Sequence, residues 1–318
     1  MKKIIRYNPA VTTFNMGDAI IFDSIERQLS DVFLDAFNVD VSSHLPVSLL
    51  FSYLMKDADY KFVLGTNLLM GHLDKLFKQW DVNLFNAKML GPAILIGVGW
   101  WQYNDKPDLY TKQIYKRILS HDVMHSVRDN YTKEMLKGMG FENVICTACP
   151  TMWSLTPEHC RDIPKTKADK VMTTLTDYSK DPEADIKMLE LLKENYKEVY
   201  LWLQGIGDMD YLKELGYEDK VKLVPPSLKR YDDMLESGEI DYVGSRLHGG
   251  IRALQKKVRT LILGVDNRAK EKAKDFNINV ISRDEADKIP EMVNSEFSTD
   301  IKIPLDEINR WKSQFLSV

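Results

Sequence analysis

The stretch SRLHGG over residues 245–250 combines residue types that a purely structural turn does not need. Arg246 carries a planar guanidinium that matches the paired oxygens of a carboxylate or a phosphate. His248 can exchange a proton near neutral pH. We expect the following helix to begin at the two glycines, where free backbone N–H groups attract anions. The residues predicted to bind a small, doubly charged anion are Arg246, Leu247, His248, Gly249 and Gly250.

A second basic residue, Arg128, directly follows the apolar stretch 122–127. Asp129 or Asn130 can cap the helix that we expect next. Taken alone, Arg128 and Asp129 fit a surface ion pair equally well. A second basic group at a strand end favours anion binding by Arg128.

Two further segments are candidates for binding a sugar. In NMGDAI, Asn15, Gly17 and Asp18 lie between a strand and a helix. From spacing alone Asp18 is better explained as an N-cap, but a carboxylate there could also hold sugar hydroxyls. No GxGxxG follows the first strand, which disfavours a dinucleotide site. Trp100 and Trp101 follow a glycine-marked strand end, and stacking on a sugar and loop packing explain them equally well.

The cysteines do not form a convincing metal site. Cys146 and Cys149 have CxxC spacing, but zinc normally takes four ligands, and only His159 and Cys160 lie nearby. We therefore expect free thiols and no metal. Three cysteines in 318 residues fit a reducing compartment better than a disulfide framework.

Composition excludes several classes of protein. The formal net charge of -4 disfavours a general nucleic-acid binder, which is normally basic. No apolar run reaches the roughly 18 residues that span a bilayer. The first residues, MKKIIRYNPA, lack the apolar core of a signal peptide. We therefore expect a cytoplasmic protein.

Short apolar runs alternate with amphipathic stretches along the whole chain, which predicts an α/β fold with parallel sheets. A proline-rich segment over 149–169 separates two such sets. We expect two Rossmann-like domains facing a central cleft, over 1–165 and 166–300, and a C-terminal helix in 301–318 packing back towards the first domain. Predicted strands cover 3–8, 60–65, 93–99, 122–127, 142–146, 170–175, 198–203, 221–224, 240–245, 259–264 and 278–282. Predicted helices cover 18–29, 108–119, 131–140, 182–196, 209–215, 231–236, 250–256, 268–276 and 305–316.

Three elements resemble the polysaccharide pyruvyl transferase family, in family order: NMGDAI, SVRDNYTKEMLKGMG, and SRLHGGIRAL followed by RTLILGVD. The likeness runs from Lys3 to about Asp284. It departs from the family pattern at Cys149-Pro150, where the family often has Asp-Pro, and at Ala19, where it more often has an acid. We carry over no role for those two positions.

The resemblance implies a GT-B-like fold and pyruvate transfer from phosphoenolpyruvate to two sugar hydroxyls. The product is a cyclic ketal of a bacterial surface polysaccharide, and phosphate is released. Family roles carried onto this chain make Arg128, Arg246 and His248 bind the donor, with Arg246 and His248 catalytic. Phosphoenolpyruvate is a co-substrate, and neither a metal nor an organic cofactor is implied.

The acceptor side is less defined. Asn15, Gly17, Asp18, Trp100 and Trp101 are the residues we expect to contact the sugar. Whether the acceptor is lipid-linked, and whether the protein associates peripherally with the inner face of the membrane, stays open. Two other functions also stay open: a GT-B glycosyltransferase using a nucleotide sugar, and a non-catalytic two-lobed protein that binds small anions.

Overall fold

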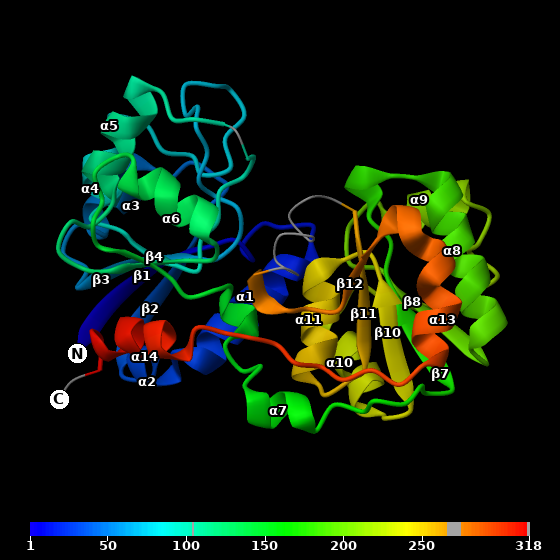
Figure 1. Ribbon diagram of the computed structural model, residues 1–318. Helices are drawn as coiled ribbons and strands as arrows, with labels where there is room; N and C mark the ends of the chain where they lie inside the picture. Colours follow the sequence, from blue (N-terminus) through cyan, green and yellow to red (C-terminus); the bar gives the residue numbers. More distant parts are fainter. Residues whose placement is uncertain (104, 266–274, 317–318) are drawn as a thin grey trace. The chain divides into compact units, whose positions relative to one another are not determined.

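The computed structural model describes residues 1–103, 105–265 and 275–316. Its contacts divide the chain into two compact units, coloured along the chain in Figure 1. The first unit comprises Met1–Thr13, Ile21–Trp153 and Pro304–Val318, and the second comprises Phe14–Ile20 and Ser154–Ile303. Within the described residues, no helix is both long enough and apolar enough to cross a bilayer.

The first unit is built on parallel strands. A four-stranded sheet has the order β2-β1-β3-β4, and β5 pairs with β6. The strands are β1 (Lys2–Asn8), β2 (Ala36–Ser42), β3 (Tyr60–Leu64), β4 (Ile94–Ile96), β5 (His125–Val127) and β6 (Val144–Cys146). Buried side chains such as Ile5, Val63 and Leu95 form one core with the helices above them.

Helices cover both faces of the first sheet (Figure 1). On one face lie α3 (Leu49–Leu54), α4 (Ala87–Leu90), α5 (Leu109–Ile118) and α6 (Asn130–Lys137). On the other lie α2 (Ser30–Phe33) and α14 (Leu305–Ser313). In α14, Trp311 donates from Nε1 to the Met124 carbonyl at 2.8 Å, which ties the end of the chain to this unit.

Side chains of β5 supply hydrogen bonds to β4 where the regular ladder is missing. The Leu95 amide donates to Nδ1 of His125 at 3.2 Å, and the Gly97 amide donates to Oγ of Ser126 at 2.9 Å. His125 Nε2 lies 2.8 Å from the Ser120 carbonyl, so Nε2 carries the proton and Nδ1 is the acceptor. Two isolated parallel β-bridges lie on either side of these hydrogen bonds: Ala93 pairs with Leu119, and Val98 pairs with Val127.

The second unit is one six-stranded parallel sheet of order β12-β11-β10-β7-β8-β9. The strands are β7 (Lys170–Thr173), β8 (Glu198–Trp202), β9 (Lys222–Val224), β10 (Ile240–Gly244), β11 (Thr260–Gly264) and β12 (Val280–Ser282). Figure 1 shows α8 (Pro182–Asn195) and α13 (Ile289–Asn294) on one face. On the other face lie α10 (Leu228–Glu236) and α11 (Leu247–Gln255), while α9 (Asp208–Glu214) follows β8 along the chain.

Every strand predicted from the apolar runs is present, usually one to three residues shorter. The prediction missed β2, because it is an edge strand whose apolar residues Phe37 and Val39 are exposed. The short helices α2, α3, α4, α7 (Pro157–Arg161) and α13 were also not predicted. The helix expected over 268–276 lies almost entirely outside the described residues.

The observed units differ from the expected domains in their boundaries. The chain passes from the first unit to the second at Trp153–Ser154, rather than at residue 165, and returns at Pro304. Phe14–Ile20, expected in the N-terminal domain, belong to the second unit. The reason is a set of long-range backbone contacts, because Met16 donates to the Gln204 carbonyl and Ile206 donates to the Phe14 carbonyl.

Candidate functional site

In the sheet of the second unit, the order in which successive strands are added reverses between β7 and β10. The chain runs outward from β7 through β8 to β9, and then returns to the other side of β7 to form β10. Ligands of open α/β sheets bind at the carboxyl ends of strands flanking such a reversal. The loops that leave β7 and β10 carry Thr174–Asp177 and Ser245–Arg246, so the residues singled out from sequence lie at this position.

Arg246 is the N-cap of α11 and is only 3% exposed. Its Nε donates to the Leu175 carbonyl at 2.7 Å, and its Nη2 donates to Asp177 at 2.7 Å and to Asp208 at 2.5 Å. Its guanidinium also lies over the ring of Tyr178, 4.9 Å from the centroid. The Nε–Nη2 edge that we expected to grip a ligand is therefore engaged inside the unit.

The Arg246 guanidinium remains cationic in this setting. Burial lowers its pKa, but the carboxylates of Asp208 and Asp177 and the Tyr178 hydroxyl raise that pKa by more. Two carboxylates beside one guanidinium compensate its charge locally. An anion at this strand end would therefore need further groups, namely the N-terminus of α11 and the half-buried His248 in its first turn.

The two glycines of SRLHGG have a packing role that sequence did not reveal. The helix begins at Leu247, two residues before Gly249. A Cβ on Gly249 would lie 3.0 Å from Oε1 of Gln204, and one on Gly250 would lie 2.6 Å from Cγ1 of Ile262. Glycine is needed here because the first turn of α11 packs directly on the sheet.

Arg252 also has a structural role. It is buried, and its guanidinium donates from Nε and Nη2 to the two carboxylate oxygens of Asp232 in α10, at 2.8 and 2.5 Å. This bidentate pair joins α10 to α11.

The segment Asn15–Asp18 reaches the same strand ends. Asn15 forms an isolated antiparallel bridge with Gly205, and its Oδ1 accepts a hydrogen bond from Nε2 of Gln204 at 3.1 Å. The helix α1 (Met16–Gln28) starts after Asn15, whose Oδ1 also accepts from the Gly17 amide at 3.0 Å. Asn15 is thus the capping residue, and the buried Asp18 lies in the first helical turn.

The sequence analysis did not identify the side chains that bind Asn15 and Arg246 at these strand ends, namely Gln204 and Asp208. Gln204 and Asp208 follow β8, and the carboxylate of Asp208 accepts from the amides of Gln204 and Gly205 at 2.9 and 2.7 Å. A Cβ on Gly205 would lie 2.5 Å from Nη2 of Arg246. The glycines in LQGIGD were the available signal, since they follow a strand end.

Arg128 belongs to the first unit, where it follows β5 and is 4% exposed. Its Nη2 donates to Oδ1 of Asn67, and its Nε lies 3.7 Å from Asp129. Asp129 caps α6, accepting from the Thr132 amide at 2.7 Å. A Cβ on Gly99 would lie 2.3 Å from Nε of Arg128, so the Arg128 side chain packs directly against the backbone of Gly99, which follows β4.

The two tryptophans differ from the expectation of sugar stacking. Trp100 is fully buried, and its Nε1 donates to the Asp105 carbonyl at 3.1 Å. Its ring is part of the core beside Tyr115, so a sugar cannot stack on it in this structure. Trp101 is half-buried, and its ring is tilted against that of Phe77, with the two ring centroids 5.6 Å apart. We carry only Trp101 forward as an acceptor-contact candidate.

Within the part of the chain that the structure describes, no disulfide involves Cys146, Cys149 or Cys160. His159 Nε2 lies 2.7 Å from the Leu254 carbonyl. Among the described residues, the side chains close enough together to ligate a metal are instead His72, Asp74 and Asp108.

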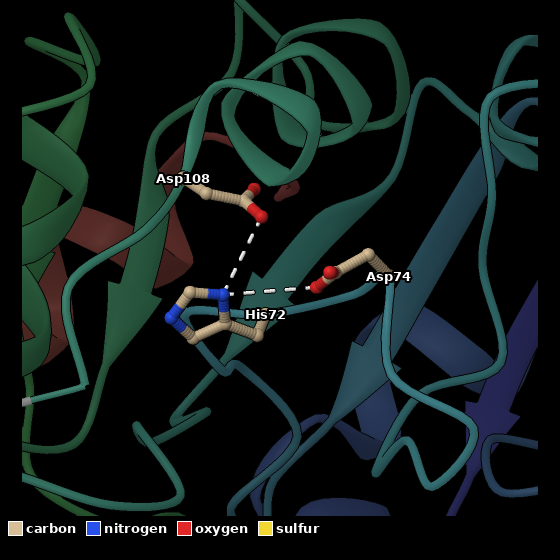
Figure 2. Close-up of side chains that lie close together, drawn as sticks. All are labelled: His72, Asp74 and Asp108. Atoms are coloured by element: carbon tan, nitrogen blue, oxygen red, sulfur yellow. Dashed lines mark ion pairs between the residues drawn. The ribbon is translucent and has the colours of Figure 1, made fainter.

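Figure 2 shows Nδ1 of His72 turned toward Asp74 and Asp108, at 3.6 and 3.4 Å. Asp108 also caps α5 through the Thr111 amide. Burial raises the pKa of the Asp108 carboxyl, but hydrogen bonds from Thr111 and His72 lower that pKa by more. These contacts explain the cluster as ion pairs at a helix start, and we assign it no metal.

Two α/β units, each built on parallel strands covered by helices, define the class of protein as GT-B-like. The UDP-GlcNAc 2-epimerase of Methanocaldococcus jannaschii, solved with UDP-GlcNAc and UDP, is similar in structure. It has a TM-score of 0.52 at 10% identity, over 96% of this chain and 95% of that chain. The UDP-GlcNAc 2-epimerase from Neisseria meningitidis, solved with UDP-GlcNAc, has a TM-score of 0.49 at 12% identity, over 99% of this chain and 94% of that chain. The lipopolysaccharide outer core galactosyltransferase WaaB has a TM-score of 0.48 at 11% identity, over 99% of this chain and 96% of that chain.

Likeness at this identity establishes the fold alone. No curated protein matches the sequence significantly. The family model for polysaccharide pyruvyl transferases matches residues 15–267, which include all three motifs described above. The chain therefore belongs to the polysaccharide pyruvyl transferase family.

Proposed function

We propose that this protein transfers pyruvate from phosphoenolpyruvate to two hydroxyls of a sugar, forming a cyclic ketal and releasing phosphate. The observation that carries the proposal is the placement of Arg246 and His248 where β10 leads into α11, beside the reversal in strand order. Family membership supplies the reaction class. The acceptor belongs to the biosynthesis of a bacterial surface polysaccharide.

The donor has a carboxylate and a phosphate, and the proposed residues match these two groups in charge. The N-terminus of α11 offers backbone N–H groups to one anionic group. Arg246 contributes its positive charge, and Arg128 of the first unit contributes a second guanidinium. Both arginines are held by neighbouring acidic or amide side chains, so little reorganisation is needed when charge develops.

His248 acts as the general acid in the proposed reaction. A proton from its imidazole adds to the methylene carbon of phosphoenolpyruvate, and the adjacent carbon becomes electrophilic. One sugar hydroxyl attacks that carbon and loses its proton. The C–O bond to phosphate then breaks, the second hydroxyl adds and loses its proton, and the ketal ring closes. Asp18 orients the acceptor hydroxyl or takes its proton.

The test is direct incubation of the protein with phosphoenolpyruvate and a panel of free and lipid-linked glycans. We expect phosphate release that depends on one glycan, together with a gain in that glycan's mass equal to one ketal-linked pyruvate. A panel with no glycan-dependent phosphate release contradicts the proposal.

A thermal-shift comparison distinguishes this function from that of a nucleotide-sugar glycosyltransferase. We expect phosphoenolpyruvate to raise the melting temperature and UDP-sugars to leave it unchanged. The opposite result would favour the glycosyltransferase. Stabilisation by phosphoenolpyruvate without turnover on any glycan would favour a binding protein.

A further inference from the structure

Gln204 has no role in the mechanism above, yet it lies among the residues that carry it. It is the second residue after β8, and its side chain is only 3% exposed. Its Nε2 donates to Oδ1 of Asn15, 189 residues earlier in the chain, at 3.1 Å. On its other side, Oε1 lies 3.0 Å from the position that a Cβ of Gly249 would occupy. Gln204 therefore hydrogen-bonds to the first family motif and lies beside the third.

The orientation of the Gln204 side-chain amide follows from the hydrogen bonds that Asn15 accepts. Oδ1 of Asn15 accepts from the Gly17 amide, so this oxygen, and not Nδ2, faces the helix start. The atom of Gln204 that approaches Oδ1 must then be a donor, which identifies it as Nε2. Oε1 is left pointing at the first turn of α11.

Oε1 of Gln204 is buried and accepts no hydrogen bond from the described residues. A buried carbonyl oxygen without a donor destabilises a fold, and an apolar side chain of the same shape removes that penalty. Stability alone therefore favours methionine at this position. A glutamine is explained if its contact with Asn15 serves function.

The backbone of Gln204 strengthens the same connection. Its carbonyl accepts from the Met16 amide at 2.8 Å, and its amide donates to Asp208, which holds Arg246. The start of α1 and the Arg246 cluster are thus joined through one residue and its neighbour. A shift of Gln204 would move Asn15 and the buried Asp18 relative to α11.

We propose that Gln204 is a positioning residue that fixes the Asn15–Asp18 segment against the first turn of α11, so that Asp18 meets the acceptor hydroxyl. The proposal rests on the proposed function. Because Gln204 acts through the acceptor-side segment, its loss lowers kcat for the sugar and leaves phosphoenolpyruvate affinity unchanged.

The experiment compares Gln204→Met with the wild-type protein and with Gln113→Met, a matched change at an exposed position of α5. Hydrogen exchange of the 14–20 peptide and the melting temperature need no substrate. Calorimetry measures phosphoenolpyruvate binding. Phosphate release gives kcat and KM with the glycan that the wild-type protein pyruvylates.

For Gln204→Met we expect faster exchange in 14–20, an equal or higher melting temperature, and unchanged phosphoenolpyruvate affinity. We expect kcat to fall by about tenfold to 100-fold, since misplacement of about 1 Å can have that effect. Gln113→Met should match the wild type. In a double-mutant cycle, the effects of Asn15→Ala and Gln204→Met on kcat should be less than additive, because both changes remove the hydrogen bond between these two side chains.

Unchanged exchange, or an unchanged kcat despite faster exchange, overturns the positioning role. A lower melting temperature with proportional loss of both donor binding and turnover also overturns it, since that pattern describes a structural residue. A wild-type protein that releases no phosphate with any glycan overturns the proposed function itself, and the positioning role falls with it whatever the exchange data show.

Discussion

Arg246 has two hydrogen-bonding edges, and the second unit uses one of them for its own cohesion. Nε and Nη2 bind Leu175, Asp177 and Asp208, which orients the guanidinium before any ligand arrives. Such preorganisation suits a residue that must stabilise charge without moving. It also means that Arg246 cannot be exchanged for another cation without disturbing its neighbours.

The substitution Arg246→Lys tests this view at the scale of one residue. A lysine keeps the charge but lacks the planar fork whose Nε reaches Leu175 while Nη2 reaches the two carboxylates. We expect a loss of about 1–3 kcal/mol in unfolding free energy, measured by denaturant titration. We also expect at least about tenfold weaker phosphoenolpyruvate binding by calorimetry, a loss of roughly 1.4 kcal/mol. Unaltered affinity would remove Arg246 from the donor site.

His248 is expected to behave differently, because it is half-buried and lies on the first turn of a helix that other residues anchor. The variant His248→Ala should fold with a near-normal melting temperature. Phosphate release with the acceptor glycan should fall about 10²–10⁴-fold, the usual contribution of a positioned general acid. Turnover at the wild-type rate would eliminate His248 as the acid.

At the scale of elements, α11 is held against its sheet by close contact. Gly249 and Gly250 let the first turn approach Tyr242 and Ile262, and Tyr231 of α10 donates to the Gly249 carbonyl at 2.8 Å. The proposed donor site depends on this packing, because the N-terminus of α11 is part of that proposal.

We therefore expect Gly250→Ala to destabilise the protein by about 1–3 kcal/mol, as overpacking does. In a double-mutant cycle, Ile262→Ala should cost less stability in the Gly250→Ala background than in the wild type, because the added Cβ would lie 2.6 Å from Cγ1 of Ile262. Gly138→Ala is the control, since a Cβ there meets its nearest atom at 3.3 Å and the backbone is helical. An equal effect of both single variants would argue against a packing role for Gly250.

The junction of β4 and β5 predicts a pH dependence of stability. Burial disfavours the charged imidazolium and lowers the pKa of His125 to about 4. Nδ1 of the neutral ring accepts from the Leu95 amide. Between about pH 6.5 and pH 4 the unfolded chain binds a proton at this histidine and the folded chain does not. Stability is therefore full above pH 6.5 and is lost as the pH falls toward 4.

The loss attributable to His125 should reach about 3 kcal/mol at pH 4, because the pKa is about 4 in the folded chain and about 6.5 in the unfolded chain. Denaturant titrations at pH 7 and pH 4.5 measure it. The variant His125→Gln, although less stable at pH 7, should show a flatter profile over that range. A profile as steep as that of the wild type would assign the acid sensitivity to other groups.

At the scale of the whole molecule, the predicted donor ligands are divided between two units. Arg128 is in the first unit, whereas Arg246 and His248 are in the second. Asn15 and Asp18, the proposed acceptor-side residues, belong to the second unit although they are near the start of the chain. In the proposed mechanism, donor and acceptor residues therefore do not divide simply by unit.

If Arg128 contributes to donor binding as proposed, phosphoenolpyruvate should stabilise the wild-type protein by about 2.7 kcal/mol at 100 times its Kd. We expect Arg128→Ala to lose most of that stabilisation in a thermal-shift assay at the same ligand concentration. Lys133→Ala, a change of a half-buried basic residue on α6, is the control and should retain it. Full stabilisation of Arg128→Ala would confine donor binding to the second unit.

The sequence by itself determined the parallel α/β architecture and the strand ends that carry unusual chemistry. Apolar runs and helical periodicity are local properties, and a buried parallel strand leaves both in the sequence. The family motifs at 15–20, 126–140 and 245–254 could be found because they too are local patterns in the sequence.

Only the tertiary structure decided which residues surround those strand ends. It brought Asn15 to Gln204, engaged Arg246 with Asp208, and buried Trp100 in the core. Each of these outcomes depends on contacts between residues far apart in the chain. No local pattern specifies such contacts, because they arise when separate elements pack and satisfy their buried polar groups together.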